Sequence, residues 1–319
     1  MKKRLALRLE VVLNRVRAPN KRCRMRGPKK QKNKKIIIMN LKNIRKTAKA
    51  GVVAVALGVA MVAGSSAKAE TLTGLVYLGN QLFTFNSSTP GTIVTSVGVS
   101  GLQSADILVG IDYLGSTLYA VGSAGNLYTV NGTTGVAALI NHFGPLNGIY
   151  FGMDASAAGI RVVSDADINL LLNASTGAII SNTPALNPSA LNIDAIATSG
   201  STTYAVDSVA NTLGILNTAT GTFATTGSMG YDVSGKNGFD ISTATGIAYF
   251  ASAVSSSGVD PNLYTVNLAT GFASLVGIIG PGEGTLIAGL TVNPVPEPGT
   301  TALALLGGAG MIALLRRRK

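Results

Sequence analysis

The sequence predicts an all-β protein, a five-bladed β-propeller whose ring is closed by pairing of the first and last strands of its body. Two observations carry this prediction. A hairpin motif recurs along residues 70–294 at intervals of 42–50 residues, and repeats of this length are typical of propellers and solenoids. Each repeat also has room for four short strands with alternating apolar and polar residues, which is the content of a propeller blade.

The most regular part of the repeat is a strand followed by an Asn-x-x-Thr-Gly loop. Residues 126–135 read NLYTVNGTTG, with side chains of opposite character alternating along the strand. The Asn side chain can accept hydrogen bonds from nearby backbone N–H groups, and Gly tolerates the positive φ that the exit of the loop needs. We expect the glycines that end the five loops to be Gly91, Gly135, Gly177, Gly221 and Gly271.

The two ends of the body complete each other. The body opens at Leu75-Val76-Tyr77, which matches the second strand of a repeat, and it finishes with residues 287–292, which match a first strand. Pairing of these segments would complete a fifth blade and remove two exposed sheet edges. Over about residues 72–293 the body also resembles an uncharacterised bacterial family, a domain of unknown function with Asn/Asp-x-x-Thr-Gly propeller repeats. That resemblance implies a fold but no activity, because propellers host unrelated functions.

The first strand of four repeats carries an aspartate, in motifs such as Gly110-Ile111-Asp112, and the fifth repeat has Thr291 instead. Because first strands line the channel of a propeller, these carboxylates are predicted to form a ring. The predicted ring consists of Asp112, Asp154, Asp194 and Asp240. Three roles remain open: fixing the packing between blades through bonds to backbone, binding Ca²⁺ or another hard cation, and catalysis. We expect no other cofactor and no other metal site.

The body lacks the charge and the motifs of several functional classes. Residues 70–294 contain two basic and twelve acidic side chains, and their net charge of −10 would repel a nucleic acid. The single Cys, Cys23, precedes the body, so we expect no disulfide and no Cys nucleophile there. No Gly-x-Ser-x-Gly motif occurs. Seven tyrosines are candidates either for stacking on sugars or for packing between blades: Tyr113, Tyr119, Tyr128, Tyr150, Tyr204, Tyr249 and Tyr264.

Residues 39–69 are predicted to be a secretory signal peptide for the Sec export machinery. A basic segment precedes the uncharged apolar run GVVAVALGVAMVA, and small residues stand at positions −3 and −1 of the expected cleavage site. The residues that define this site are Ala67, Ala69 and Glu70. Upstream, residues 1–38 form a basic extension without a fold signal. It is either a nucleic-acid-binding arm or, as we favour, a stretch placed before the true start at Met39.

Residues 295–319 carry a second targeting signal. The motif Pro296-Glu297-Pro298 is followed by an apolar stretch at 300–315 and by the basic cluster Arg316, Arg317, Arg318 and Lys319. As a helix the apolar stretch would be about 24 Å long, near the hydrocarbon thickness of a bilayer, and the terminal cations favour the cytoplasmic side. A plain membrane anchor would explain the helix and the cations but not the Pro-Glu-Pro.

This order resembles the PEP-CTERM sorting signal, and all three of its parts are present. The resemblance implies recognition of Pro296, Glu297 and Pro298 by an exosortase, a membrane-embedded cysteine protease. It also implies delivery to the cell envelope or the extracellular space after transient membrane anchoring, commonly with exopolysaccharide in a biofilm. The sequence therefore predicts an exported, exosortase-sorted surface or extracellular-matrix protein with a non-enzymatic binding or structural role. The alternative is a secreted glycan-active enzyme that uses the channel carboxylates.

Overall fold

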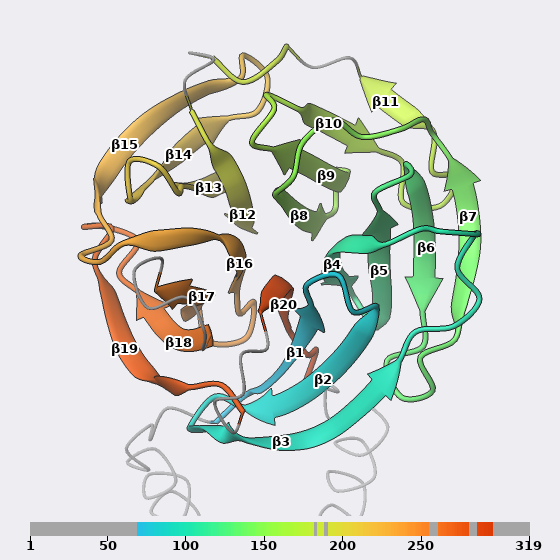
Figure 1. Ribbon diagram of the computed structural model, residues 1–319. Coiled ribbons are helices and arrows are strands. Elements are labelled where there is room, and N and C mark those ends of the chain that lie inside the picture. The colour runs from blue at the N-terminus through green and yellow to red at the C-terminus, as the bar shows by residue number, and fades with distance from the viewer. Residues whose placement is uncertain (1–68, 182–183, 188–190, 255–260, 281–285, 296–319) are drawn as a thin grey trace, which may run out of the picture. The chain divides into compact units, whose positions relative to one another are not determined.

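Five four-stranded antiparallel sheets are arranged as the blades of a propeller (Figure 1). They hold all the strands of the part of the chain that this computed structural model describes, residues 69–181, 184–187, 191–254, 261–280 and 286–295. No helix occurs in those residues. The all-β, five-bladed fold is therefore confirmed.

The blades are numbered along the chain, and in each the strands are given from the axis outward. Blade 1 contains β20 (Ile287–Val292), β1 (Thr71–Val76), β2 (Gln81–Asn86) and β3 (Thr89–Gly98). Blade 2 contains β4 (Leu108–Leu114), β5 (Thr117–Gly122), β6 (Asn126–Val130) and β7 (Ala137–His142), and blade 3 contains β8 (Phe151–Ser156), β9 (Gly159–Ser164), β10 (Asn169–Leu172) and β11 (Ile179–Ser181). Blade 4 contains β12 (Ile193–Ser199), β13 (Thr202–Asp207), β14 (Thr212–Asn217) and β15 (Thr222–Ser228), and blade 5 contains β16 (Val233–Ile241), β17 (Ala248–Val254), β18 (Pro261–Val266) and β19 (Ala273–Ile278).

Blade 1 closes the ring by joining the two ends of the body. β1 pairs with β20 in an antiparallel register that places Leu72 opposite Val292. The last strand of the body thus becomes the innermost strand of the first blade (Figure 1). The predicted closure is confirmed. It also brings both ends of the described body to one face, where the backbone N–H of Asn293 donates to the carbonyl of Thr71 over 2.9 Å.

Four of the five hairpin loops have the predicted chemistry. Their Asn side chains accept hydrogen bonds from the backbone N–H groups two and three residues further on, at Asn131, Asn173, Asn217 and Asn267. The glycines that follow have positive φ, at Gly135, Gly177, Gly221 and Gly271.

The first loop differs from the prediction. Gly91 lies inside β3, and Asn86 pairs with Thr89 across a two-residue turn. Pro90 separates the Thr from the Gly in this copy, so the Thr-Gly exit of the other loops is missing. The expectation that Gly91 ends a loop was wrong for that reason.

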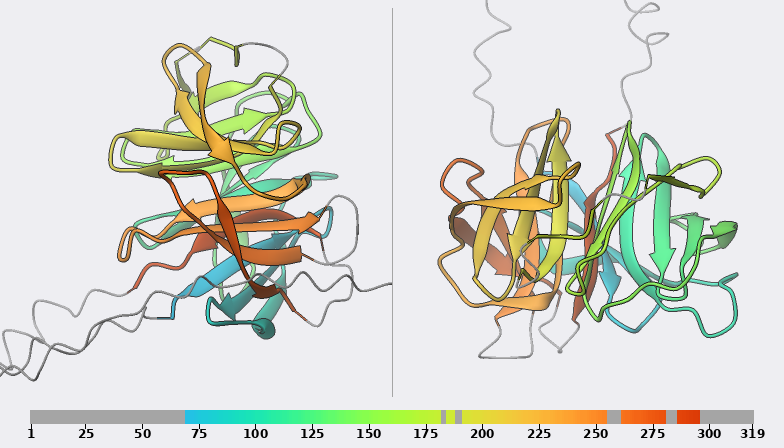
Figure 2. Two further views of the ribbon diagram at one scale, coloured as in Figure 1. Left: turned by 90° about the vertical axis from the view of Figure 1, so that its left-hand side faces the viewer. Right: turned by 90° about the horizontal axis from the view of Figure 1, so that it is seen from above.

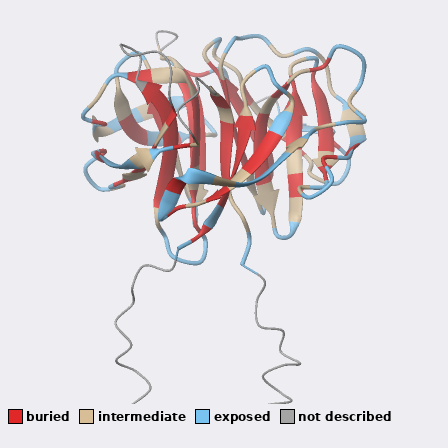
Figure 3. Ribbon diagram, turned by 60° about the horizontal axis from the view of Figure 1, so that its bottom comes forward, coloured by how far each residue is buried: buried red, intermediate tan, exposed pale blue. Residues whose placement is uncertain are grey.

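The hydrophobic core lies between the blades, which pack face to face (Figure 2). Leu75 and Leu82 of blade 1 are buried against Leu118 and Tyr128 of blade 2, and similar clusters occupy the other four seams. Buried residues accordingly run along strands throughout the ring (Figure 3). Because apolar burial drives folding, each blade gains its stability from both neighbours, and closure of the ring completes the last seam.

Several predicted segments lie outside the described residues. These are the basic extension 1–38, the signal peptide up to residue 68, the Pro-Glu-Pro motif at 296–298, and the apolar stretch 300–315 with its basic cluster. In the ranges that are described, no helix is long and apolar enough to cross a membrane.

Candidate functional site

Three of the four predicted carboxylates share one level of the ring. Asp112 on β4, Asp154 on β8 and Asp240 on β16 each stand opposite the corresponding residue of the second strand of their blade. Thr291 on β20 takes this position in blade 1, as the sequence predicts. The innermost strands therefore present three carboxylates and one hydroxyl at the same height.

Asp194 does not belong to this level, and this part of the prediction was wrong. A bulge between Ile193 and Ala195 leaves Asp194 without a partner in the ladder, and Ala197 occupies the position opposite Tyr204. The segment that corresponds to Gly110-Ile111-Asp112 is thus 195–197, which has kept neither the Gly nor the Asp. The motif that ends in Asp194 therefore lies three residues before the position that is equivalent to Asp112.

The three equivalent aspartates bond to the next blade around the ring. Asp112 Oδ2 accepts from the backbone N–H of Ala155 over 2.6 Å, and Asp154 Oδ1 accepts from that of Thr198 over 2.7 Å. Asp240 Oδ2 likewise accepts from the N–H of Val292 over 2.6 Å. In every case the donor comes one residue after the position on the neighbouring inner strand that is equivalent to the aspartate. These carboxylates act as clips between blades.

The seam between blades 4 and 5 lacks such a clip, because Ala197 has no carboxylate. Asp194 bridges this seam at another height, since its Oδ1 accepts from Asn237 Nδ2 on β16 over 2.8 Å. Ser208 donates to its other oxygen. Asp194 is fully buried, and the buried Oδ1 of Asn237 has no hydrogen-bond partner within the described part of the chain.

Burial shifts the titration of these carboxyls toward neutral pH. It raises the pKa of Asp194 to about 7 and that of Asp240 to about 6. Burial, then the nearby Asp240 and Asp154 carboxylates, raises the pKa of Asp112 well above its usual range. Burial also raises the pKa of Asp154, while the hydrogen bonds that Asp154 accepts from Thr198 lower it in part. A carboxyl with a pKa near neutrality has the titration property of a general acid.

The axis offers little room for a ligand, and Asp194 is the only one of the four aspartates that lines its cavity. The cavity enclosed by the five innermost strands has a volume of about 10 Å³, the space that one water molecule needs. A Cβ on Gly152 would lie 2.9 Å from the Cα of Ala195, and one on Gly238 would lie 2.3 Å from the backbone N of Leu290. The glycines therefore let neighbouring inner strands come together. Among the described residues no three His, Cys, Asp or Glu side chains converge on a point that could hold a metal ion.

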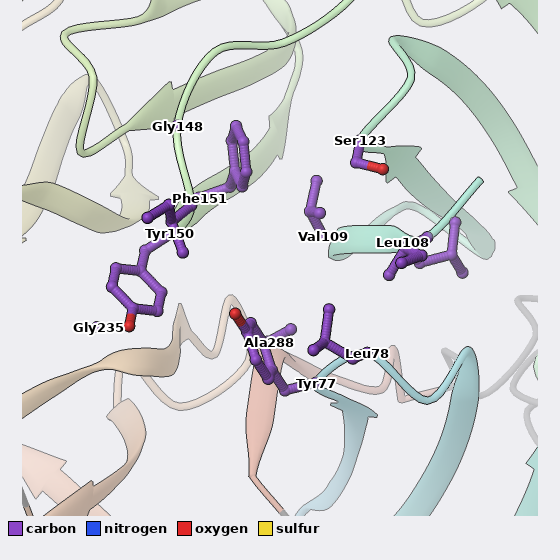
Figure 4. A pocket seen from close by; sticks show the side chains of 12 residues that line it. Tyr77, Leu78, Leu108, Val109, Ser123, Gly148, Tyr150, Phe151, Gly235 and Ala288 are labelled. Carbon is purple, nitrogen blue, oxygen red and sulfur yellow. The ribbon is translucent and has the colours of Figure 1, made fainter. Parts of the chain in front are cut away.

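A larger cavity of about 240 Å³ opens at one end of the axis (Figure 4). This cavity, which we call the cup, lies on the face of the propeller where the innermost strands of the blades begin. Blades 1, 2, 3 and 5 supply its walls, with mostly apolar side chains. Its lining includes Tyr77, Leu78, Val109, Tyr150, Phe151 and Ala288.

Tyr77, Tyr150 and Ser123 are the polar side chains that line the cup, and Lys236 lies beside Tyr77. The ring centroids of Tyr77 and Tyr150 are 6.4 Å apart, and Lys236 Nζ lies 5.3 Å from the centroid of Tyr77. The loop that carries Tyr150 is held by Asp165, whose Oδ1 accepts from the N–H groups of Ile149 and Tyr150. Burial, then Tyr150 and Asp165, raises the pKa of Tyr77. The Tyr77 phenol therefore stays protonated at neutral pH and can donate a hydrogen bond.

Leu78 at the rim of the cup has an unfavourable conformation for its residue type. Its φ is 59° and its side chain is 61% exposed. A bulky residue with positive φ is uncommon, and such strain concentrates at functional positions. The sequence candidates included Tyr150 but not Tyr77, Leu78 or Lys236. A Tyr-Leu pair next to a Gly was the only signal in the sequence for the first two.

The predicted cleavage site ends at a residue that is built into the fold. Ala69 is exposed, whereas Glu70 is 4% exposed. The Glu70 carboxylate accepts hydrogen bonds from Ser242, from Thr245 Oγ1 over 3.0 Å and from Tyr249 over 2.9 Å. All three donors belong to blade 5, so the first residue of the expected mature chain fastens blade 1 to blade 5.

Comparison with known proteins identifies the body. Residues 81–291 match the family described as Domain of unknown function (DUF4394). The chain belongs to this family. Residues 294–319, which follow the DUF4394 region, match the PEP-CTERM protein-sorting motif. Both resemblances noted in the sequence are confirmed, and the DUF4394 protein is an exported protein that an exosortase sorts.

The DUF4394 fold is similar to several solved structures. Glutaminyl cyclase from Myxococcus xanthus is 12% identical, with a TM-score of 0.43 over 62% of this chain and 83% of that one. A protein of unknown function from Bacteroides caccae is 9% identical, with a TM-score of 0.41 over 71% of this chain and 100% of that one. One from Bacteroides thetaiotaomicron is 13% identical, with a TM-score of 0.42 over 70% of each chain. No curated protein matches the DUF4394 chain.

Proposed function

We propose that this protein is displayed on or released from the cell surface, and that its propeller binds a glycan of the extracellular matrix without converting it. The binding surface is the cup. Sec-dependent export and association with exopolysaccharide belong to this proposal. It is supported by the sorting motif at 294–319 and by the way the fold orients the cup.

The observation that carries the proposal is the position of the cup relative to the chain ends. Asn293 and Thr71 are bonded on one face, and the sorting motif begins at residue 294. At the other end of the same strand pair, the N–H of Tyr77 donates to the carbonyl of Leu286 over 2.8 Å, next to the cup. Attachment through the sorting segment would therefore hold the domain by one face and present the cup on the opposite face.

The chemistry of the cup suits a sugar ring. A pyranose has an apolar face that packs on aromatic rings and hydroxyl groups that need hydrogen-bond partners. Tyr77 and Tyr150 offer rings and phenol groups, Lys236 adds a donor, and Leu78 extends the apolar rim. Small-molecule sites commonly combine an apolar lining with a few polar groups in this way.

The test is retention of the exported protein on polysaccharide isolated from the extracellular matrix. We expect Tyr150→Ala to weaken binding at least about tenfold, which corresponds to about 1.4 kcal/mol. Phe272→Ala is the matched control, because Phe272 is an exposed aromatic residue away from the cup. Equal binding by the wild type and Tyr150→Ala would contradict the assignment of the cup.

The alternative function, a glycan-active enzyme, is favoured by the near-neutral pKa values of Asp194 and Asp240, since glycoside hydrolysis needs a carboxyl that is protonated near pH 7. Three observations favour binding instead. The equivalent aspartates are engaged in bonds between blades, the axial cavity of about 10 Å³ is far smaller than a sugar, and Asp194 is fully buried. Turnover of matrix polysaccharide that is lost in a folded Asp154→Asn variant would establish the enzyme.

A further inference from the structure

A row of threonines crosses blade 1 from the axis to the rim. The register pairs Thr291 of β20 with Thr73 of β1, Thr73 with Thr84 of β2, and Thr84 with Thr95 of β3. The equivalent row of blade 4 is Ala197, Tyr204, Ile215 and Ala224. A continuous line of hydroxyl groups is thus a feature of blade 1 and not a general consequence of the repeat.

The threonine row lies on the face of blade 1 that faces blade 2, between an apolar row and the end of the sheet away from the cup. Residues two apart in a strand share a face, so Leu75, Leu82 and Val97 lie on the same face, one step nearer the cup. That apolar row packs against blade 2. At the threonine row blade 2 no longer fills the space, and a groove of about 660 Å³ opens between the two blades.

The groove lies on the face opposite the cup. Thr71, Thr84 and Thr95 of blade 1 line the groove with their hydroxyl groups. Tyr113 of blade 2 lines the groove as well. Asn293, which is bonded to Thr71 through the backbone, lies at the groove's inner end. None of the described residues that line the groove is charged.

The polar groups of the groove have unused hydrogen-bonding capacity within the described residues. Thr84 and Thr95 share a single hydrogen bond of 2.6 Å between their hydroxyls, which leaves one O–H group to donate elsewhere. Asn293 Oδ1 accepts from Thr73, but no described group accepts from its amide nitrogen. The same holds for the amide nitrogen of Asn131, whose Oδ1 caps the loop.

The absence of charge in this lining and its row of hydroxyl and amide groups favour a ligand that is itself uncharged and rich in hydroxyl groups. A polyanion would find no cation here, and it would meet the net negative charge of the body. An apolar peptide would leave the threonine and asparagine groups unpaired, which costs binding free energy. We infer that the groove between blades 1 and 2 binds a strand of an uncharged polysaccharide. This site is separate from the cup and does not depend on it.

The experiment is a titration of the exported protein with neutral hexasaccharides of glucose, mannose and galactose, with alginate as the charged comparison. Thr84→Val and Thr95→Val keep the β-branched shape and remove one hydroxyl each. We expect the double variant to bind the preferred neutral hexasaccharide at least tenfold more weakly. Thr225→Val on the outer strand of blade 4, also exposed, is the matched control and should bind as the wild type does.

The outcomes separate the groove from the cup. Weaker binding in the threonine double variant and unchanged binding in Tyr150→Ala support the groove. Binding that Tyr150→Ala removes and the double variant retains overturns it and supports the cup alone. Failure of all three neutral hexasaccharides to bind at millimolar concentration, or binding of alginate in their place, also overturns the inference. Thermal unfolding of each variant checks that the propeller is intact.

Discussion

Removal of the Glu70 carboxylate should open the seam between blades 1 and 5. Glu70→Ala removes the acceptor of three hydrogen bonds, and two of its donors, Ser242 and Tyr249, are 2% and 3% exposed. A buried donor that loses its partner costs about 1–3 kcal/mol. Two such donors give a predicted loss of about 2–6 kcal/mol in the free energy of unfolding. That is a large part of the stability of an ordinary domain.

The assay is urea unfolding of the exported protein, combined with a double-mutant cycle. Tyr249→Phe removes one donor alone, so the cycle with Glu70→Ala measures the coupling between the two groups. We expect the two substitutions to be non-additive, with a coupling free energy of about 1 kcal/mol or more. Asp232→Ala is the control, because Asp232 is an exposed acid and its substitution should change stability by less than about 0.5 kcal/mol.

Two results would refute this reasoning. One is a loss of less than about 1 kcal/mol in Glu70→Ala, which would mean that water replaces the carboxylate without cost. The other is strict additivity with Tyr249→Phe, which would mean that the hydrogen bond of 2.9 Å contributes nothing to closure.

Three further predictions concern the axis. Asp154→Asn should reduce the free energy of unfolding by about 1–3 kcal/mol, because it weakens a clip between blades 3 and 4; glycan binding measured on the folded variant should be unchanged. Stability should fall as pH rises from about 4 to 7, because burial raises the pKa of Asp194 to about 7, so the folded protein holds a proton that the unfolded chain has already released. The slope is at most about 1.4 kcal/mol per pH unit for this group, and urea midpoints across the range should flatten in Asp194→Asn; an unchanged pH dependence would contradict the prediction. Gly152→Ala should cost about 1–3 kcal/mol by forcing inner strands apart, whereas Gly98→Ala, where the added Cβ meets no atom within 4 Å, should be nearly neutral in thermal unfolding.

The fold could be predicted because its information is local and repeated. Each Asn-x-x-Thr-Gly loop fixes one hairpin through bonds within five residues, as at Asn131, and the spacing of these loops sets the number of blades. The closing pair was predictable because residues 287–292 lacked a partner elsewhere. Where a copy departed from the pattern, as at Pro90, local reasoning assigned the wrong turn.

The candidate sites were less predictable because they depend on register and on contacts between blades. Asp194 lies three residues before the position that is equivalent to Asp112, and nothing in the sequence motif marks this difference. The cup joins Tyr77 and Tyr150 from two blades, and Lys236 of a third blade lies beside Tyr77. The threonine row becomes visible only when the pairing of β20, β1, β2 and β3 is known. Sequence reasoning could name Tyr113 and Tyr150 as candidates for sugar contacts but could not tell which groups would join them.

The axis and the two faces of this propeller carry different tasks. The carboxyl groups near the axis accept hydrogen bonds from the neighbouring inner strand, as Asp112 and Asp240 do. Glu70 likewise connects blades 1 and 5 at the closing seam. The two proposed binding surfaces lie on the faces, where the cup is mainly apolar and aromatic and the groove carries a row of hydroxyl groups. Because the two surfaces lie at opposite ends of the strands, a domain that uses both can hold two glycan strands at once. Two linked sites bind a network more strongly than either alone, so the two proposed sites together would let this rigid propeller cross-link glycan strands.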